Sequence, residues 1–261
     1  LALIGDAGHN LSDVVSLLLA WGASVLAARS ATEKRTYGYR KATVMASLAS
    51  GILLLIALGG ITREAVGRLL DPNPVEGMTV VVVAAIGVVI NALTALLFVK
   101  GQKQDLNIRG AFLHMAADAG GSLGVVVAGI FILTGGWLWI DPVVTLGIVA
   151  VIFISTWGLL RDSINYAIDA VPKSVDIAGI RQYFMNLDRV DRVHDLHVWP
   201  LSTTEIALTA HIVVNDHSLD NDFLRRVQQT LHDRFGIEHA TIQTESAVTE
   251  NECTLDRNSC K

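Results

Sequence analysis

Long runs of apolar residues, separated by short polar segments, occupy the first part of the chain. We predict that five of these runs span a membrane. About 20 apolar residues, rising about 1.5 Å each, are enough to cross the hydrocarbon core of a bilayer. The segment Asp71-Pro72-Asn73-Pro74 ends the second run sharply. The pattern therefore predicts an α-helical membrane bundle whose spans are residues 1–28, 42–70, 78–99, 110–133 and 143–160.

The last part of the chain has shorter elements with a different period. Two amphipathic stretches are predicted to be helices, and three β-branched stretches with polar alternation are predicted to be strands. The order α-β-β-α-β predicts a small α+β sandwich with its helices on one face of the sheet. The elements are residues 175–187, 190–200, 205–214, 219–235 and 240–245.

Composition supports this division into a membrane part and a soluble part. Apolar residues make up 51% of the chain, and the mean hydropathy of +0.46 is too high for a single soluble domain. Acidic and basic residues balance over residues 1–170, so the net charge of −5 belongs to the remainder. We therefore expect a transmembrane domain over residues 1–170, an α+β domain over residues 171–245 and a flexible tail over residues 246–261.

Charges between the spans predict how the chain is oriented in the membrane. Residues 29–41 and 100–109 are rich in Lys and Arg, which places both loops in the cytoplasm by the positive-inside rule. The α+β domain is then also cytoplasmic. Five spans are an odd number, so a further span is expected to precede residue 1. The chain has no basic stripe and its pI is about 5.9, so we expect no nucleic-acid partner.

Two of the predicted spans carry ionisable residues, which are costly inside a bilayer and are therefore candidates for function. In each span a His precedes an Asp by four positions, so both side chains lie on the same face of a helix. Two such helices together offer two imidazoles and two carboxylates, a ligand set that suits tetrahedral Zn²⁺ better than Mg²⁺ or Ca²⁺. The alternative is that each pair is only a hydrogen bond that ties two helices together. The four residues are His9, Asp13, His114 and Asp118.

A metal site of these four ligands inside a membrane is compatible with metal transport. It is also compatible with two other functions. An intramembrane metallohydrolase needs an open coordination position and a general base. Four protein ligands close the shell, and the chain has no HExxH motif, so we expect no enzymatic activity. A membrane-tethered metal sensor is the second alternative, and it predicts that the membrane site can be removed without loss of function. For transport, the ligands must lose protons to bind metal, which couples metal export to proton uptake.

Five segments together resemble the cation diffusion facilitator family, in particular its bacterial zinc, cadmium and cobalt efflux branch. The resemblance implies a homodimeric antiporter in the inner membrane that exchanges divalent metal for protons. It also implies six spans and a cytoplasmic α+β domain of the metallochaperone-like (ferredoxin-like) kind. The family's first span is then the one expected upstream. The segments are GDAGHNLSD (5–13), YGYRKA (37–42), FLHMAADAGGSLG (112–124), HDLHVWPL (194–201) and HATIQTE (239–245).

The resemblance also implies roles for individual residues. The two His-Asp pairs fall on the family's transport site, and Asp6 is either a hydrogen-bond acceptor for His9 or an ordinary carboxylate at a helix end. Lys41 and Asp169 match an inter-helix charge pair, although each could instead anchor its own helix end. Some relatives bind metal in the first cytoplasmic loop through His residues that are replaced here by Arg35 and Tyr39, so we do not expect that site.

A second zinc site is implied in the cytoplasmic domain, where four residues fall on positions that bind zinc in family members. The four are His194, His211, His239 and Glu245. Further candidates are weaker individually: His197, His217 and His232, and the thiolates of Cys253 and Cys260. In the reducing cytoplasm a disulfide between the two cysteines is disfavoured, so zinc ligation is the more plausible role for them.

Overall fold

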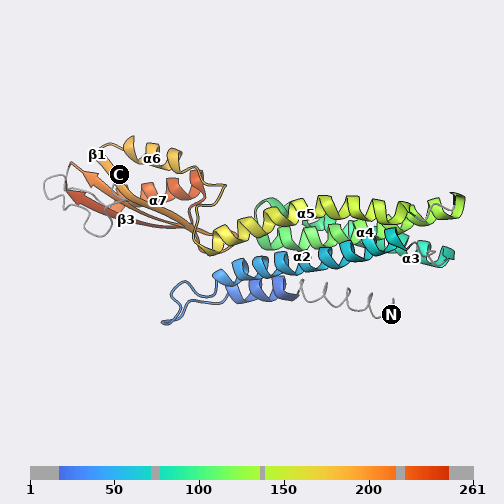
Figure 1. The fold of residues 1–261 in the computed structure, drawn as a ribbon. Helices are drawn as coiled ribbons and strands as arrows, with labels where there is room; N and C mark the ends of the chain where they lie inside the picture. Colours follow the sequence, from blue (N-terminus) through green and yellow to red (C-terminus); the bar gives the residue numbers. More distant parts are fainter. Residues whose placement is uncertain (1–17, 72–76, 136–138, 216–220, 247–261) are drawn as a thin grey trace. The chain divides into compact units, whose positions relative to one another are not determined.

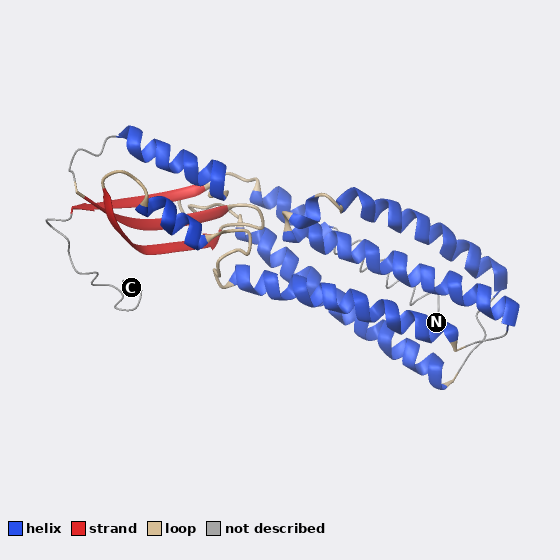
Figure 2. Ribbon diagram, turned by 90° about the horizontal axis from the view of Figure 1, so that it is seen from above, coloured by secondary structure: helices blue, strands red, loops and turns tan. Residues whose placement is uncertain are grey.

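The structure is a computed structural model that describes residues 18–71, 77–135, 139–215 and 221–246. It divides into two compact units, Leu1–Ile164 and Asn165–Lys261. The first unit is helical, and the second contains a sheet with two helices (Figures 1 and 2). Each unit has its own core, and each is described by itself below.

The N-terminal unit is a bundle of long helices that lie alongside one another in both views (Figures 1 and 2). Three described helical stretches are long and apolar enough to cross a membrane: Lys41–Leu70, Leu106–Phe131 and Pro142–Ala167. Two shorter apolar helical stretches, Leu18–Ala27 and Ala84–Phe98, accompany them. The predicted helical membrane bundle is confirmed. Its labelled helices are α2 (Lys41–Leu70), α3 (Gly77–Phe98), α4 (Leu106–Gly135) and α5 (Ile140–Ala167), with the short 3₁₀ helix η1 (Gly101–Lys103) before α4.

Helix α4 begins one turn earlier than the apolar pattern predicts, at Leu106 instead of near Gly110. The Oδ1 atom of Asp105 accepts a hydrogen bond from the backbone N–H of Asn107 over 2.7 Å. An Asp in this position satisfies a backbone N–H that has no partner within the helix, so it favours a helix start. The first turn of α4 is therefore polar, and it lies within the stretch that the sequence indicates as a basic loop.

The core of the helical unit lies between α2, α4 and α5. Leu54 and Leu58 of α2 pack with Leu113 and Ala117 of α4, and α5 completes the cluster with Ile152 and Leu159. Gly120 of α4 allows close approach to α5, because a Cβ atom there would lie 2.8 Å from Cγ2 of Ile148. This packing leaves a neighbouring face of α4 to carry His114 and Asp118.

The C-terminal unit is a three-stranded sheet with two helices (Figure 2). Its strand order is β1-β2-β3, in which β1 and β2 are antiparallel and β2 and β3 are parallel. This is the predicted α-β-β-α-β order, and the α+β fold class is confirmed. The elements are α6 (Ile177–Met185), β1 (Val190–Pro200), β2 (Ile206–Val214), α7 (Asn221–Phe235) and β3 (His239–Ser246).

Alternation along β2 shows which face of the sheet the helices cover. Leu208, Ala210 and Ile212 belong to one buried cluster together with Phe184 of α6 and Leu231 of α7. Successive side chains in a strand point to opposite faces. Both helices therefore cover the face of the even-numbered β2 residues, and the odd-numbered residues of β2 point to the other, open face.

Candidate metal centres

The first candidate centre lies on α4, where His114 and Asp118 are both buried. Nε2 of His114 is 3.7 Å from Oδ2 of Asp118, and each side chain is 7% exposed. The four-residue spacing places the two groups one helical turn apart on the same face. A buried imidazole beside a buried carboxylate offers one nitrogen and one oxygen to a cation, which is half of a tetrahedral shell.

The same face of α4 contacts the N-terminal helical segment Leu18–Ala27. Asn107 lies on that face, because it precedes His114 by seven residues and Asp118 by eleven, each within about 20° of whole turns at about 100° per residue. Its Nδ2 donates to the carbonyl oxygen of Ala20 over 2.9 Å and to Oγ of Ser24 over 3.3 Å. The face that presents His114 and Asp118 therefore looks towards this segment at its cytoplasmic end.

The other half of the expected membrane site is His9 and Asp13, and both lie outside the described residues, as does Asp6.

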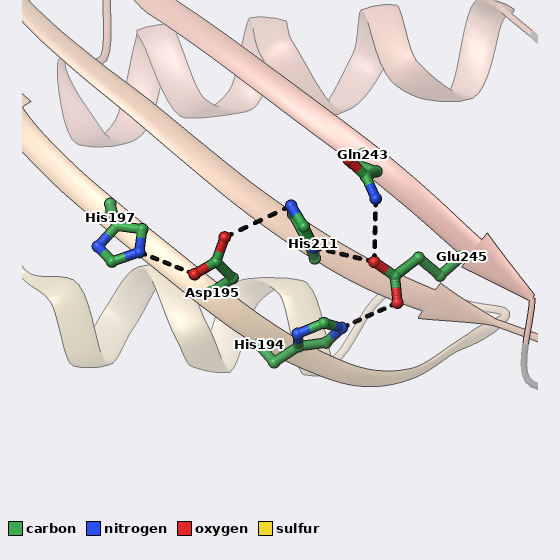
Figure 3. A network of polar contacts seen from close by, with 6 residues as sticks. All are labelled: His194, Asp195, His197, His211, Gln243 and Glu245. Carbon is green, nitrogen blue, oxygen red and sulfur yellow. Dashed lines mark hydrogen bonds and ion pairs between the residues drawn. The ribbon is translucent and has the colours of Figure 1, made fainter. Parts of the chain in front are cut away.

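The second candidate centre lies on the open face of the sheet, and each strand contributes one residue (Figure 3). His194 of β1 pairs directly with His211 of β2, and Glu245 of β3 lies two pairs further along the parallel ladder, opposite Val213. Nε2 of His194 is 3.1 Å from Oε2 of Glu245, and Nδ1 of His211 is 2.9 Å from Oε1. One carboxylate thus holds both imidazoles.

These three residues have the chemistry and spacing of a zinc site. One ligand atom from each of His194, His211 and Glu245 lies within 4.8 Å of the others. Around Zn²⁺, with bonds of about 2.0–2.1 Å, tetrahedral ligands lie about 3.3 Å apart, so small side-chain movements are enough. The side chains are 11%, 26% and 18% exposed respectively, which leaves the site accessible to a fourth ligand.

Asp195 is a supporting residue that the sequence analysis did not identify. Its Oδ2 lies 3.5 Å from Nε2 of His211, and its Oδ1 lies 2.9 Å from Nε2 of His197 (Figure 3). Metal-binding histidines commonly donate their second N–H to a carboxylate, which fixes the ring orientation. Asp195 has a φ of 50° at an irregularity in β1, and the extra residue lets both His194 and His197 face the open side. Such a bulge is hard to read from sequence.

His239 does not join this cluster within one chain. It begins β3 opposite Ala207, six residues before Glu245. At about 3.3 Å per residue the two are about 20 Å apart along the strand. The expectation that groups His239 with the other three is therefore not met in the single chain, because both residues face the same side of the strand but at opposite ends.

The remaining candidates are placed as follows. His232 lies on α7, and its side chain contacts Asp233 and Glu238, away from the open-face cluster. Lys41 begins α2 in the first unit and Asp169 follows α5 in the second unit, so their pairing stays a prediction. Arg35 stacks over the Tyr39 ring at 4.6 Å in the first cytoplasmic loop. His217, Cys253 and Cys260 lie outside the described residues.

Comparison with known protein families gives matches to both parts of the chain. Residues 1–166 match the cation efflux transmembrane domain, and residues 172–247 match the cytoplasmic domain of cation efflux proteins. These ranges correspond to the helical unit and the sheet unit. They confirm an integral membrane protein whose C-terminal domain is cytoplasmic.

Individual relatives are bacterial proteins similar over nearly the whole chain. The metal cation efflux system protein CzcD of Cupriavidus metallidurans is 37% identical over 252 residues, which is 96% of this chain and 79% of the relative. The cadmium, cobalt and zinc/H(+)-K(+) antiporter of Bacillus velezensis is 34% identical over 260 residues, or 98% of this chain and 83% of the relative. The zinc transporter ZitB of Escherichia coli is 36% identical over 248 residues, or 94% and 79%.

A solved structure, the metal-bound C-terminal domain of the CzcD transporter from Cupriavidus metallidurans, is 36% identical and covers 27% of this chain and 99% of that chain, with a TM-score of 0.25. The bacterial relatives and the apolar helices together indicate the inner membrane. Because family matches cover both the membrane unit and the cytoplasmic unit, this chain belongs to the cation efflux, or cation diffusion facilitator, family.

Proposed function

We propose that this protein exports divalent metal cations, principally Zn²⁺, from the cytoplasm in exchange for protons. The observation that carries the proposal is the buried His114–Asp118 pair in the middle of an apolar helix. An imidazole and a carboxylate held inside the membrane are costly to bury, and cation binding is a function that makes use of both. The names of the relatives, which include zinc, cadmium and cobalt transport, support the same substrate class.

We further propose that His9 and Asp13 complete the transport site. The segment Leu18–Ala27 leads into a cytoplasmic loop and α4 leaves one, so the two run in opposite directions. Asn107 touches Ala20, and antiparallel helices rise equally on either side of such a contact.

A helix that continued from Ala20 towards residue 1 would reach Asp13 after seven residues, the level of His114 on α4. After eleven residues it would reach His9, the level of Asp118. This matched spacing favours a shell of two imidazoles and two carboxylates, which suits Zn²⁺, Cd²⁺ and Co²⁺.

Proton exchange follows from the ligands themselves. Imidazole must be neutral and carboxylate ionised to bind metal, so each binding event releases protons that had occupied the site. Facing a more acidic outside, the same groups take up protons and expel the metal. The inward proton gradient then drives export without any separate proton pathway.

The cytoplasmic unit is proposed to bind zinc at His194, His211 and Glu245 and to form the homodimer. Its acidic surface opposes self-association, and bound cations offset that repulsion. We place His239, at the far end of β3, in a ligand set that includes the second copy. Thiolate ligation of zinc stays the prediction for Cys253 and Cys260.

The test is zinc flux in proteoliposomes that contain the purified full-length protein. An inward-directed proton gradient is expected to drive zinc movement in the opposite direction, and a protonophore is expected to abolish it. His114→Ala serves as the matched control that keeps the fold and loses the ligand. Zinc flux that ignores the proton gradient would contradict antiport, and full activity of His114→Ala would favour the sensor alternative, in which the membrane site is dispensable.

A further inference from the structure

The polar contacts inside the helical unit are concentrated at its cytoplasmic end. There Ser47 of α2 and Ser163 of α5, both fully buried, share a hydrogen bond of 3.1 Å. Asn107 contacts the N-terminal segment, as described above, and Arg109 contacts α5. Leu54 of α2, Leu113 of α4 and Ile152 of α5 belong to the apolar cluster between the same three helices.

Arg109 forms an ion pair across the α4–α5 interface. Its Nη1 donates to Oδ2 of Asp162 over 2.9 Å, and the two side chains are 29% and 12% exposed. Gly158 makes room for the guanidinium, because a Cβ atom at that position would lie 3.0 Å from Nη2 of Arg109. A partly buried, hydrogen-bonded pair is strong enough to hold two helices together, yet it can exchange for water when they separate.

Asn107 and Arg109 project from nearly opposite sides of α4. Two residues apart on a helix are separated by about 200° of rotation, so one side chain reaches the N-terminal segment and the other reaches α5. Both lie between His114 and the cytoplasmic end of α4, and Arg109 is about 7.5 Å below His114 at about 1.5 Å per residue. Both contacts therefore lie on the cytoplasmic side of His114, on two faces of α4.

Asn107 also has a buried hydrogen-bond acceptor without a donor in this arrangement. Its side chain is 4% exposed, and its Oδ1 is buried without a hydrogen-bond partner, while its Nδ2 makes both contacts to the N-terminal segment. A buried acceptor that lacks a donor raises the free energy of the closed arrangement, and water in an opened arrangement would relieve it. A contact of this kind suits an element that alternates between two states.

We propose that Asn107 and Arg109 form a two-sided lock on α4 that closes the cytoplasmic approach to His114 and Asp118 and has to open once in each transport cycle. This proposal rests on the proposed transport function. Both are positioning residues, since neither is assigned as a metal ligand. A static brace would have the same contacts but would never need to break, and that difference makes the proposal testable.

The first experiment replaces the Asn107 contact by a reversible covalent bond. Ser24→Cys and Asn107→Cys are introduced together into full-length protein that carries Cys253→Ser and Cys260→Ser, and disulfide formation is measured as loss of free thiol. Oxidation is expected to lower proton-driven zinc flux at least 20-fold, and a reductant is expected to restore it. Each single cysteine variant is the matched control, and its flux, whatever its level, is expected to be the same with and without the oxidant.

Undiminished flux in the cross-linked protein would overturn the lock, because a static brace tolerates a permanent bond. Failure of the proposed function looks different, since then the parent protein with only the two serine replacements shows no proton-driven flux either. In that case the lock is still tested by the rate of disulfide formation, which zinc is expected to slow at least threefold. An unchanged rate would overturn it.

The second experiment separates opening from folding at Arg109. Arg109→Ala weakens the closed state, so the KM for zinc on the cytoplasmic side is expected to fall about threefold to tenfold while the maximal rate also falls. Arg109→Lys keeps the charge and is expected to restore both values at least in part. A raised or unchanged KM in Arg109→Ala would overturn the proposal, because simple loss of folded protein lowers the maximal rate alone.

Discussion

The two candidate metal centres are built in opposite ways. His114 and Asp118 come from one helix, four residues apart, and their nearest N and O atoms are separated by 3.7 Å. His194, His211 and Glu245 come from three strands, and the Glu245 carboxylate holds both imidazoles at hydrogen-bond distance. The helical pair can change its partners when the helices move, whereas the sheet cluster is fixed by ladder hydrogen bonds. The first arrangement suits a metal that must be released, and the second suits a metal that stays.

The difference predicts that the helical pair is required for turnover. Asp118→Ala removes one ligand from a site without a spare, so we expect loss of transport to background while the protein still folds and dimerises. The measurement is zinc flux in proteoliposomes, together with the oligomer mass of the purified variant. Normal flux in Asp118→Ala would break the comparison, since the helical pair would then be dispensable.

The sheet cluster is expected to govern binding and not turnover. Glu245→Ala removes the carboxylate shared by both histidines, so its loss of cytoplasmic zinc affinity should exceed the about 10- to 100-fold that is typical of a supporting residue. Competition with a zinc chelator, in full-length protein that also carries Asp118→Ala, isolates this site. Glu238→Ala, a change at an exposed carboxylate near His232, is the control. Equal affinities in the Glu245→Ala and control proteins would remove the cluster as a zinc site.

Asp195 provides a further test of the sheet cluster, because it affects zinc binding only by orienting His211. Asp195→Asn keeps the shape but weakens the acceptor that orients His211, so we expect a loss of zinc affinity of about 10-fold, the lower end for such residues. The same chelator competition measures it. A loss as large as that of Glu245→Ala would instead make Asp195 a ligand.

Metal selectivity is expected to change by a smaller amount. His9→Asp exchanges a nitrogen ligand for a hard oxygen, which favours Mn²⁺ and Fe²⁺ relative to Zn²⁺. We expect a severalfold rise in manganese transport relative to zinc, measured by competition in proteoliposomes. Undetectable manganese transport in this variant would argue against His9 as a ligand.

The smallest expected effect lies outside both centres, at the end of α7. The hydrogen bond that His232 donates to Asp233 and the negative charge of Glu238 raise the pKa of His232 above its ordinary value of 6.5. Its folded pKa therefore exceeds the unfolded one, so the stabilisation is fully present below about pH 6.5 and is lost as the pH rises through the raised pKa. His232→Gln should remove this contribution, so the thermal midpoint should fall slightly less as the pH rises above 6.5. The effect is small because the His232 side chain is exposed and its charge is screened by solvent. An identical pH profile would contradict the pairing.

Local patterns in the sequence predicted the features that depend on near neighbours. The strand over residues 190–200 has the predicted bounds. The His114–Asp118 spacing places both groups on one face of a helix wherever that helix packs. Helix α4 starts earlier than predicted, because the cap by Asp105 outweighs the polar character of the following turn.

Features that depend on distant neighbours were not visible in the sequence. The ion pair between Arg109 and Asp162 joins two helices, and neither residue carries a local signal of the other. Asp195 reaches His211 only because the strand bulges, and sequence alternation does not record a bulge. His239 shares a strand and a face with Glu245, but distance along β3 separates them. The family resemblance indicated which residues could bind zinc, but it did not indicate the distance between His239 and Glu245.

The most direct test of the central claim is the coordination of zinc in the membrane site. The sample is full-length protein with His211→Ala and Glu245→Ala, so that zinc is retained only at the transport site, and the measurement is X-ray absorption at the zinc edge. The account predicts two imidazole nitrogens and two carboxylate oxygens at about 2.0–2.2 Å, and loss of the bound zinc after Asp118→Ala. Sulfur ligands at about 2.3 Å, or zinc binding unchanged by Asp118→Ala, would contradict it.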